Sequence, residues 1–202
     1  MKLSEIKTSG SILGAVYGPS WPLVLIRCQR EAGRIFRASR WSRQPGPEAQ
    51  FVQRLTLAAA IYQKLLQKFE KNEAFDIVRR IIVPIGTKEQ FEHASKVTND
   101  WKDEMARLEA FHDLMDVRGG PRFNTRIFLE RTSRICHFQI TRCVFFDFFS
   151  DIGLPELTKL FCEVDRVFFP TEFPKIKFHR NGSWENTIAY GKDHCEFVFE
   201  SI

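Results

Sequence analysis

The sequence predicts an α+β fold, in which a mainly helical part packs on a small, mostly antiparallel sheet with two crossing helices. Apolar residues recur at helical spacing before the break at Gly119-Gly120-Pro121, and strict alternation typical of strands follows it. The length of 202 residues, 44% of them hydrophobic, suits one compact domain. We therefore expect a single domain over residues 1–202, mainly helical over 1–118 and α+β over 121–202.

Proline and glycine divide the helical part into separate predicted helices. A helix over 22–40 ends at the turn Gln44-Pro45-Gly46-Pro47, where a second, long helix begins. A third helix covers 72–83 and is predicted to end before Pro84, because proline lacks the backbone N–H of a helix interior. The charged segment Glu89–Asp113 is predicted as an exposed helix over the core.

The remainder alternates between strands and helices. Residues 134–142, 176–180 and 195–199 each alternate between two faces and are predicted as strands. A short aromatic helix after the first strand breaks at Gly153-Leu154-Pro155, and a second helix runs from Glu156 to Phe169. The sheet and its helices thus lie within the last third of the chain.

The net charge of +5 is concentrated in a basic stripe between Arg27 and Arg43. On a helix, Arg27, Arg30, Arg34 and Arg37 fall within about 80° of arc. Such a stripe suits phosphates, anionic lipid or an acidic substrate, and it equally suits a solvated helix face. No nucleic-acid partner is expected, because no recognition module or interleaved aromatic pattern accompanies the stripe.

Hydropathy and the spacing of the cysteines indicate where in the cell the protein is expected. No stretch approaches the roughly 20 apolar residues of a membrane-spanning helix, so no integral membrane association is expected, and no signal peptide is apparent. The five cysteines form no CxxC pair, which favours reduced thiols and a cytoplasmic location. Cys28 and Cys136 are predicted as packing residues.

Three other cysteines and an aspartate are candidates for site chemistry. Cys143 lies where a strand passes into a helix, and the helix dipole together with Arg142 is expected to lower its thiol pKa. Cys162 and Asp165 are neighbours on one helix flank. Cys195 is predicted to point into the core from its strand.

We expect these four side chains to meet in one interior, although each thiol could instead be a small buried hydrophobe. No cofactor is expected. A structural zinc bound by Cys143, Cys162, Asp165 and Cys195 is the alternative, but their spacing matches no standard zinc module.

Four segments carry a family resemblance: Ile140-Thr-Arg-Cys143, Gly153-Leu-Pro-Glu156-Leu, Cys162-Glu-Val-Asp165 and Thr187-Ile-Ala-Tyr-Gly-Lys-Asp-His-Cys195-Glu-Phe197. In order and spacing they resemble the L-2-amino-thiazoline-4-carboxylic acid hydrolase family. The resemblance covers residues 136–199 closely and the helical segment 55–82 more loosely. It implies an enzyme that hydrolyses a C–N bond of a small cyclic amidine.

Roles for individual residues follow from the resemblance. Cys162 is the leading nucleophile, with Cys143 and Cys195 as the other thiols, and Asp165 holds or shuttles the proton. His194 is a candidate base. Arg180 is the candidate for binding the substrate carboxylate. The further candidates for substrate binding are Thr187, Arg142 and Phe145.

Two departures from the family pattern bear on the substrate. An arginine that commonly stands just before the equivalent of Thr187 is absent, and the nearest is Arg180. Phe145 replaces a frequent tyrosine. Both favour a larger, less polar small molecule, such as a secondary-metabolite intermediate. A non-catalytic small-molecule-binding or sensor module with a Cys/Asp metal site is the competing interpretation, and a homo-oligomer stays open.

Overall fold

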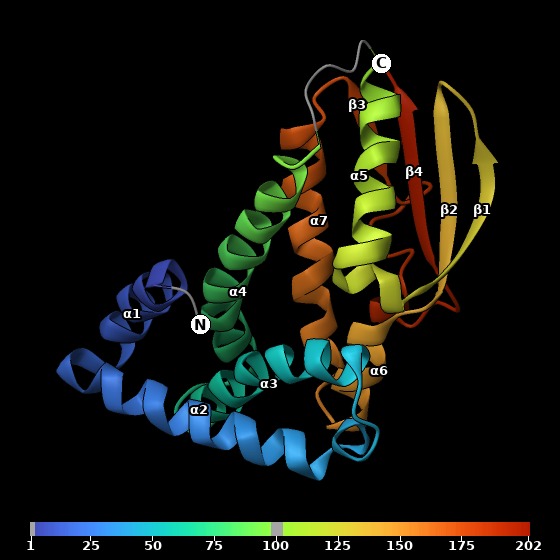
Figure 1. Cartoon of the computed structure of the whole chain (residues 1–202). Helices are drawn as coiled ribbons and strands as arrows, with labels where there is room; N and C mark the ends of the chain where they lie inside the picture. The colour runs from blue at the N-terminus through green and yellow to red at the C-terminus, as the bar shows by residue number, and fades with distance from the viewer. Residues whose placement is uncertain (1–2, 98–102) are drawn as a thin grey trace. The chain divides into compact units, whose positions relative to one another are not determined.

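The predicted α+β fold is confirmed by the computed structural model, which describes residues 3–97 and 103–202 (Figure 1). The helices are α1 (Leu3–Tyr17), α2 (Trp21–Ala38), α3 (Pro47–Leu66), α4 (Lys71–Ala94), α5 (Glu104–Arg118), α6 (Val144–Asp151) and α7 (Thr158–Glu172). The strands are β1 (Thr125–Arg131), β2 (Ile135–Arg142), β3 (Ile176–His179) and β4 (Cys195–Ser201).

The chain forms two compact units, which are described separately. One comprises Met1–Gly86 and Phe148–Leu160, and the other comprises Thr87–Asp147 and Phe161–Ile202. The prediction of a single domain over 1–202 is not tested by this division and stays a prediction.

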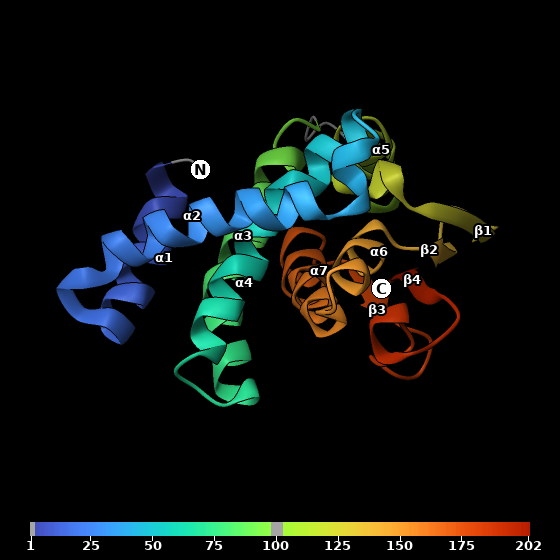
Figure 2. The ribbon, with the colours of Figure 1, turned by 90° about the horizontal axis from the view of Figure 1, so that it is seen from below.

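The second unit contains the antiparallel sheet, with strand order β1-β2-β4-β3. In the β2–β4 pair, Phe138 lies opposite Phe197 and Ile140 lies opposite Cys195. Helices α5 and α7 cover the same face of the sheet (Figures 1 and 2). Alternation thus sends one set of strand side chains into the core and the other set to the opposite, outer face.

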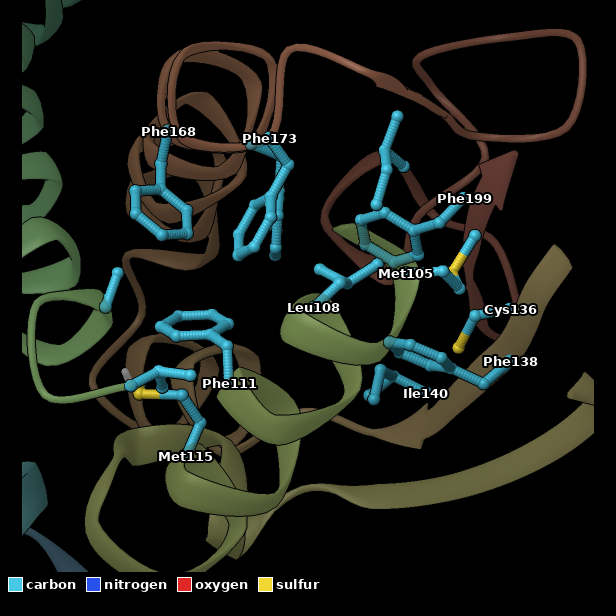
Figure 3. Packing of buried hydrophobic residues seen from close by; sticks show 14 of the residues in the cluster. Met105, Leu108, Phe111, Met115, Cys136, Phe138, Ile140, Phe168, Phe173 and Phe199 are labelled. Carbon is cyan, nitrogen blue, oxygen red and sulfur yellow. The ribbon is translucent and has the colours of Figure 1, made fainter. Parts of the chain in front are cut away.

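Aromatic rings from α5, α7 and the sheet fill the core of this unit (Figure 3). Phe111 of α5 lies 5.1 Å from Phe168 of α7, measured between ring centroids. His112 packs at 5.4 Å from Phe138 and 5.2 Å from Phe199. Neither ring nitrogen of His112 has a hydrogen-bond partner in the described part of the chain, and burial lowers the pKa of the imidazole to about 3.

In the first unit, α1 and α2 form a tight pair joined at Gly18-Pro19-Ser20 (Figure 1). Gly18 has a φ of 58°, a conformation that glycine adopts without strain. A Cβ atom on Gly10 would lie 2.7 Å from the ring of Trp21, so glycine permits this close packing. The stretch Ile6–Ala38 is long and apolar enough to cross a membrane by length and composition alone, a test that soluble core helices also pass.

The Gly153-Leu-Pro-Glu156 segment is anchored within the same unit. Gly153 has a φ of 73°, which allows the turn after α6. The Glu156 carboxylate accepts a hydrogen bond from the buried Tyr62 hydroxyl at 3.3 Å and pairs with Lys71 at 2.7 Å. The glycine and the glutamate of this segment therefore have structural roles, in the turn and in these two contacts.

Two predictions about elements were wrong, and one strand was missed. Helix α4 continues through Pro84, because burial of Ile81 and Ala94 on either side offsets a cost of about 3 kcal/mol for interior proline. Glu89–Asp113 is not one exposed helix: it spans the end of α4 and most of α5, residues 98–102 lie outside the described residues, and α5 buries Phe111. Strand β1 was not predicted.

We expect His112→Phe to stabilise the protein more at pH 5 than at pH 8. Protonation of His112 is disfavoured in the folded state. Between pH 6.5, the pKa in the unfolded chain, and about pH 3, the pKa in the folded protein, the unfolded chain therefore binds more protons at this residue. Wild-type stability therefore falls by up to about 1.4 kcal/mol per pH unit below about 6.5. Denaturant unfolding of both proteins at the two pH values measures the difference, and an equal difference at both would contradict this assignment.

Candidate functional site

The three candidate thiols come from three elements of the second unit. Cys143 directly precedes α6, Cys162 lies on α7, and Cys195 opens β4. Each is a free thiol, and negative charge on Cys195 or Cys162 would raise the pKa of Cys143. Cys195 belongs to the buried core of the unit, as expected from its strand position. The meeting of all four side chains in one interior stays a prediction.

Cys143 lies at the N-terminus of α6, but its expected pKa lowering was wrong. The backbone N–H groups of Phe145 and Phe146 do favour its thiolate. Burial opposes them more strongly and raises the thiol pKa. Arg142 does not assist, because it pairs with Asp147 at 2.8 Å and donates to the Phe123 carbonyl at 3.0 Å.

An ion pair between Arg180, which is buried, and Asp165, which is 21% exposed, acts on the pKa values of Cys162 and Cys195. Arg180 Nη2 donates to Asp165 Oδ2 at 3.0 Å, and Arg180 Nη1 donates to the Glu196 carbonyl oxygen, also at 3.0 Å. The guanidinium carbon lies 3.7 Å from the centroid of the Phe197 ring, and the Arg180 side chain is 1% exposed. Burial raises the pKa of Asp165 to about 6, although Arg180 acts in the opposite direction.

Cys162 and Cys195 share the surroundings of this pair. Burial raises the pKa of the Cys162 thiol to about 12, with Arg180 lowering it and Asp165 raising it. The Ile188 backbone N–H donates to the Cys195 sulfur at 3.3 Å. Thr187 is fully buried beside Cys162 and favours its thiolate, yet its hydroxyl makes no hydrogen bond of ordinary geometry with a described residue.

His194 is not brought to the thiols. Its Nε2 atom lies 2.9 Å from Glu196 Oε1 and 3.1 Å from Gln139 Nε2, on the face of β4 opposite Cys195. Glu196 also pairs with His137 Nε2 at 2.6 Å. The two histidines and the glutamate form a separate cluster on the outer face of the sheet, so His194 is poorly placed as a base for Cys162.

The remaining surroundings are aromatic. Phe145 stacks on Phe161 with the ring centroids 4.4 Å apart. The Trp184 ring lies 5.2 Å from the Arg180 guanidinium, and its buried indole N–H has no partner among the described residues. Trp184 was not predicted as a site residue, although it lies in the sequence between the candidates Arg180 and Thr187.

In the described parts of the chain, no group of three or more His, Cys, Asp and Glu side chains is arranged to hold a metal ion. The zinc alternative for Cys143, Cys162, Asp165 and Cys195 therefore gains no geometric support.

The arrangement combines thiols, an acid titrating near neutral pH and unsatisfied donors. Asp165 can exchange a proton near pH 6. The Nε atom of Arg180, the Thr187 hydroxyl and the Trp184 indole N–H are buried without partners in the described structure. Buried polar groups normally have partners, so these atoms are suited to a polar ligand or to water.

The family model described as L-2-amino-thiazoline-4-carboxylic acid hydrolase matches residues 49–199. No curated protein is significantly similar to the chain in sequence. The chain is similar over its whole length to an H-NOX protein from S. oneidensis in the Fe(II)NO ligation state, covering 99% of that chain at 14% identity and a TM-score of 0.43. An unliganded Fe(II) H-NOX protein from K. algicida gives 10% identity, 97% coverage and a TM-score of 0.37. Scores this low support neither a shared fold nor a shared function.

We expect Arg180→Gln to destabilise the protein by roughly 3–5 kcal/mol, because Asp165 then lacks its buried countercharge. The matched control is Arg79→Gln, which removes an exposed pair with Asp76 and is expected to cost about 1 kcal/mol or less. Denaturant unfolding at pH 8 measures both. Equal small losses would show that the Arg180 pair contributes no more than a surface pair.

We expect the native thiols of Cys143 and Cys162 to react slowly with a disulfide reagent at pH 8. A thiol with a pKa of about 12 is ionised in roughly one molecule in ten thousand at that pH. Labelling followed by peptide mass analysis should show modification at least ~100-fold slower than in denatured protein. Rapid labelling of either residue would contradict the burial argument.

Proposed function

Since the chain belongs to the L-2-amino-thiazoline-4-carboxylic acid hydrolase family, we propose that it is a cysteine-dependent hydrolase acting on a C–N bond of a small cyclic amidine or related heterocycle. Membership supports hydrolase activity in general. We propose in addition that a cysteine is the nucleophile, that a C–N bond is cleaved, and that the substrate is a small heterocycle. It requires reduced thiols, which suits a cytoplasmic location, and no cofactor.

The observation that carries the proposal is that Asp165, which pairs with Arg180, lies three residues from Cys162 on α7. Asp165 is paired with Arg180 at 3.0 Å, and its charge acts on the pKa of Cys162. With a pKa near 6, Asp165 is mostly ionised at neutral pH and can accept a proton. A nucleophile and an adjacent base are the minimal components of covalent hydrolysis.

In the proposed first step, the Cys162 sulfur bonds to the amidine carbon while the thiol proton passes to Asp165. The resting thiol is strongly disfavoured as a thiolate, so deprotonation accompanies attack instead of preceding it. A protonated, cationic amidine assists, because it adds positive charge beside the sulfur. The bond between the amidine carbon and the ring nitrogen then breaks, and Asp165 gives the proton to that nitrogen.

In the second step, water adds to the same carbon while Asp165 accepts one of its protons. The bond from that carbon to the Cys162 sulfur then breaks, and Asp165 gives the proton to the released sulfur. In a 2-amino-thiazoline this carbon is bonded to two nitrogens and one sulfur, so ring opening breaks either a C–N or a C–S bond. Opening at nitrogen releases an amine, whereas opening at sulfur releases a thiol. The product therefore identifies the bond directly, and an amine is expected under the proposal.

We assign substrate recognition to the buried donors that have no partner among the described residues and to the Phe145 and Phe161 rings. Arg180 already shares its charge with Asp165, so its Nε atom, with the Thr187 hydroxyl, is proposed to donate to the substrate carboxylate. Phe145, stacked on Phe161, contributes no hydrogen bond through its ring. We therefore favour a substrate with a larger apolar part, such as a secondary-metabolite intermediate.

We expect Cys162→Ser to reduce turnover of 2-amino-thiazoline-4-carboxylate, or of a more apolar analogue, by at least ~100-fold. A hydroxyl is a far weaker nucleophile than a thiol in the same position. The matched control is Cys136→Ala, which removes a core thiol of the same unit and should retain most of the turnover. Full activity of Cys162→Ser would exclude Cys162 as the nucleophile.

We expect kcat/KM to fall as the pH drops through about 6, because Asp165 must be ionised to accept the proton. Asp165→Asn should abolish this pH dependence together with most of the activity. Glu163→Gln, which alters a partly exposed ion pair with Arg166 on the same helix, should change neither the pH dependence nor the activity. A profile that stays flat between pH 5 and pH 7 in the wild type would count against Asp165 as the base.

The competing function is a non-catalytic small-molecule-binding or sensor module. It shares the unsatisfied donors with the hydrolase proposal but needs no proton acceptor. Tight substrate binding by calorimetry with no turnover, together with unchanged binding in Cys162→Ser, would favour it.

A further inference from the structure

We propose that the exposed face of α2 docks the protein on an anionic membrane surface. This α2 outer face consists of Leu23, Ile26, Arg27, Arg30, Arg34 and Arg37. Their helical positions fall within about 100° of arc. The proposal concerns a peripheral contact and is independent of the proposed hydrolysis.

The burial pattern of α2 leaves this face open within the first unit. Val24, Cys28 and Ile35 are buried on the opposite side of the helix. All six residues of the α2 outer face are exposed. The face is therefore neither part of the hydrophobic core of its unit nor covered by it.

The charge of this face is largely uncompensated. Arg34 pairs with Glu31 at 3.1 Å, an exposed pair within the same helix. In the part of the chain that the structure describes, no carboxylate pairs with Arg27, Arg30 or Arg37. Three guanidinium groups thus project from one side of the helix, where their fields add.

Two large aliphatic side chains accompany these arginines. Leu23 is 62% exposed and Ile26 is 45% exposed, both at the N-terminal end of the α2 outer face. An exposed aliphatic residue is common by itself, but a basic face that also carries aliphatic residues matches helices that lie in the headgroup region of a bilayer. The stretch Ile6–Ala38, which includes α2, is long and apolar enough to cross a membrane by length and composition alone.

The same features distinguish a lipid surface from nucleic acid. Proteins that bind single-stranded nucleic acid usually supply aromatic rings on which bases stack. The α2 outer face contains none, since Trp21 and Phe36 project from other sides of the helix. Burial of its aliphatic side chains among acyl chains would lower the free energy of binding, whereas contact with phosphates would bury little apolar surface.

Cosedimentation of the full chain with vesicles tests the proposal. Vesicles containing about 30% phosphatidylglycerol in phosphatidylcholine should bind the protein at about 0.1 M salt and release most of it at about 1 M. Arg27→Gln, Arg30→Gln and Arg37→Gln combined should weaken binding roughly a hundredfold, at about fivefold per arginine. Leu23→Ser with Ile26→Ser should weaken it at both salt concentrations.

The matched control is the triple variant Lys88→Gln, Arg118→Gln and Lys175→Gln, which removes three exposed charges elsewhere and should retain binding. Circular dichroism verifies that every variant is folded. Equal binding to pure phosphatidylcholine, equal binding by the α2 variant and its control, or binding to RNA without binding to vesicles would each overturn the proposal.

Discussion

The ion pair between Asp165 and Arg180 is the interaction on which the candidate site depends. Removing two charges from water costs several kcal/mol each, so a buried pair persists only where further hydrogen bonds and polarisable neighbours compensate. Arg180 has such partners in the Glu196 carbonyl and the Phe197 ring. It thereby connects α7 to the end of β3 and the start of β4, the elements that position Cys162 and Cys195.

Burial dominates the electrostatics of this interior. At Cys143, the backbone N–H groups of α6 favour the thiolate, but the loss of solvent outweighs them. A helix terminus carries only about half an elementary charge, whereas complete desolvation shifts a pKa by several units. The thiols are therefore held protonated, and reactivity would depend on a nearby base or a cationic ligand.

Sequence periodicity predicted β2, β3, β4 and the helices between them, because each has one buried and one polar face. It failed at β1, an edge strand that is exposed along nearly its whole length, and at Pro84, where packing overrides a local rule. The burial of Cys162 and Cys195 could be predicted from their places on the apolar sides of a helix and a strand. The Asp165–Arg180 pair could not, since neither spacing nor periodicity indicates which cation a strand end will bring to a helix.

The hydrogen bond from Arg180 to the main chain at position 196 limits which substitutions can disturb the site. Arg180 binds the main-chain carbonyl of that residue, whereas the Glu196 side chain belongs to the histidine cluster on the outer face. Every amino acid presents the same carbonyl. Replacements at position 196 can therefore change the outer surface during evolution while Arg180 keeps its hydrogen bond to the main-chain carbonyl of that position.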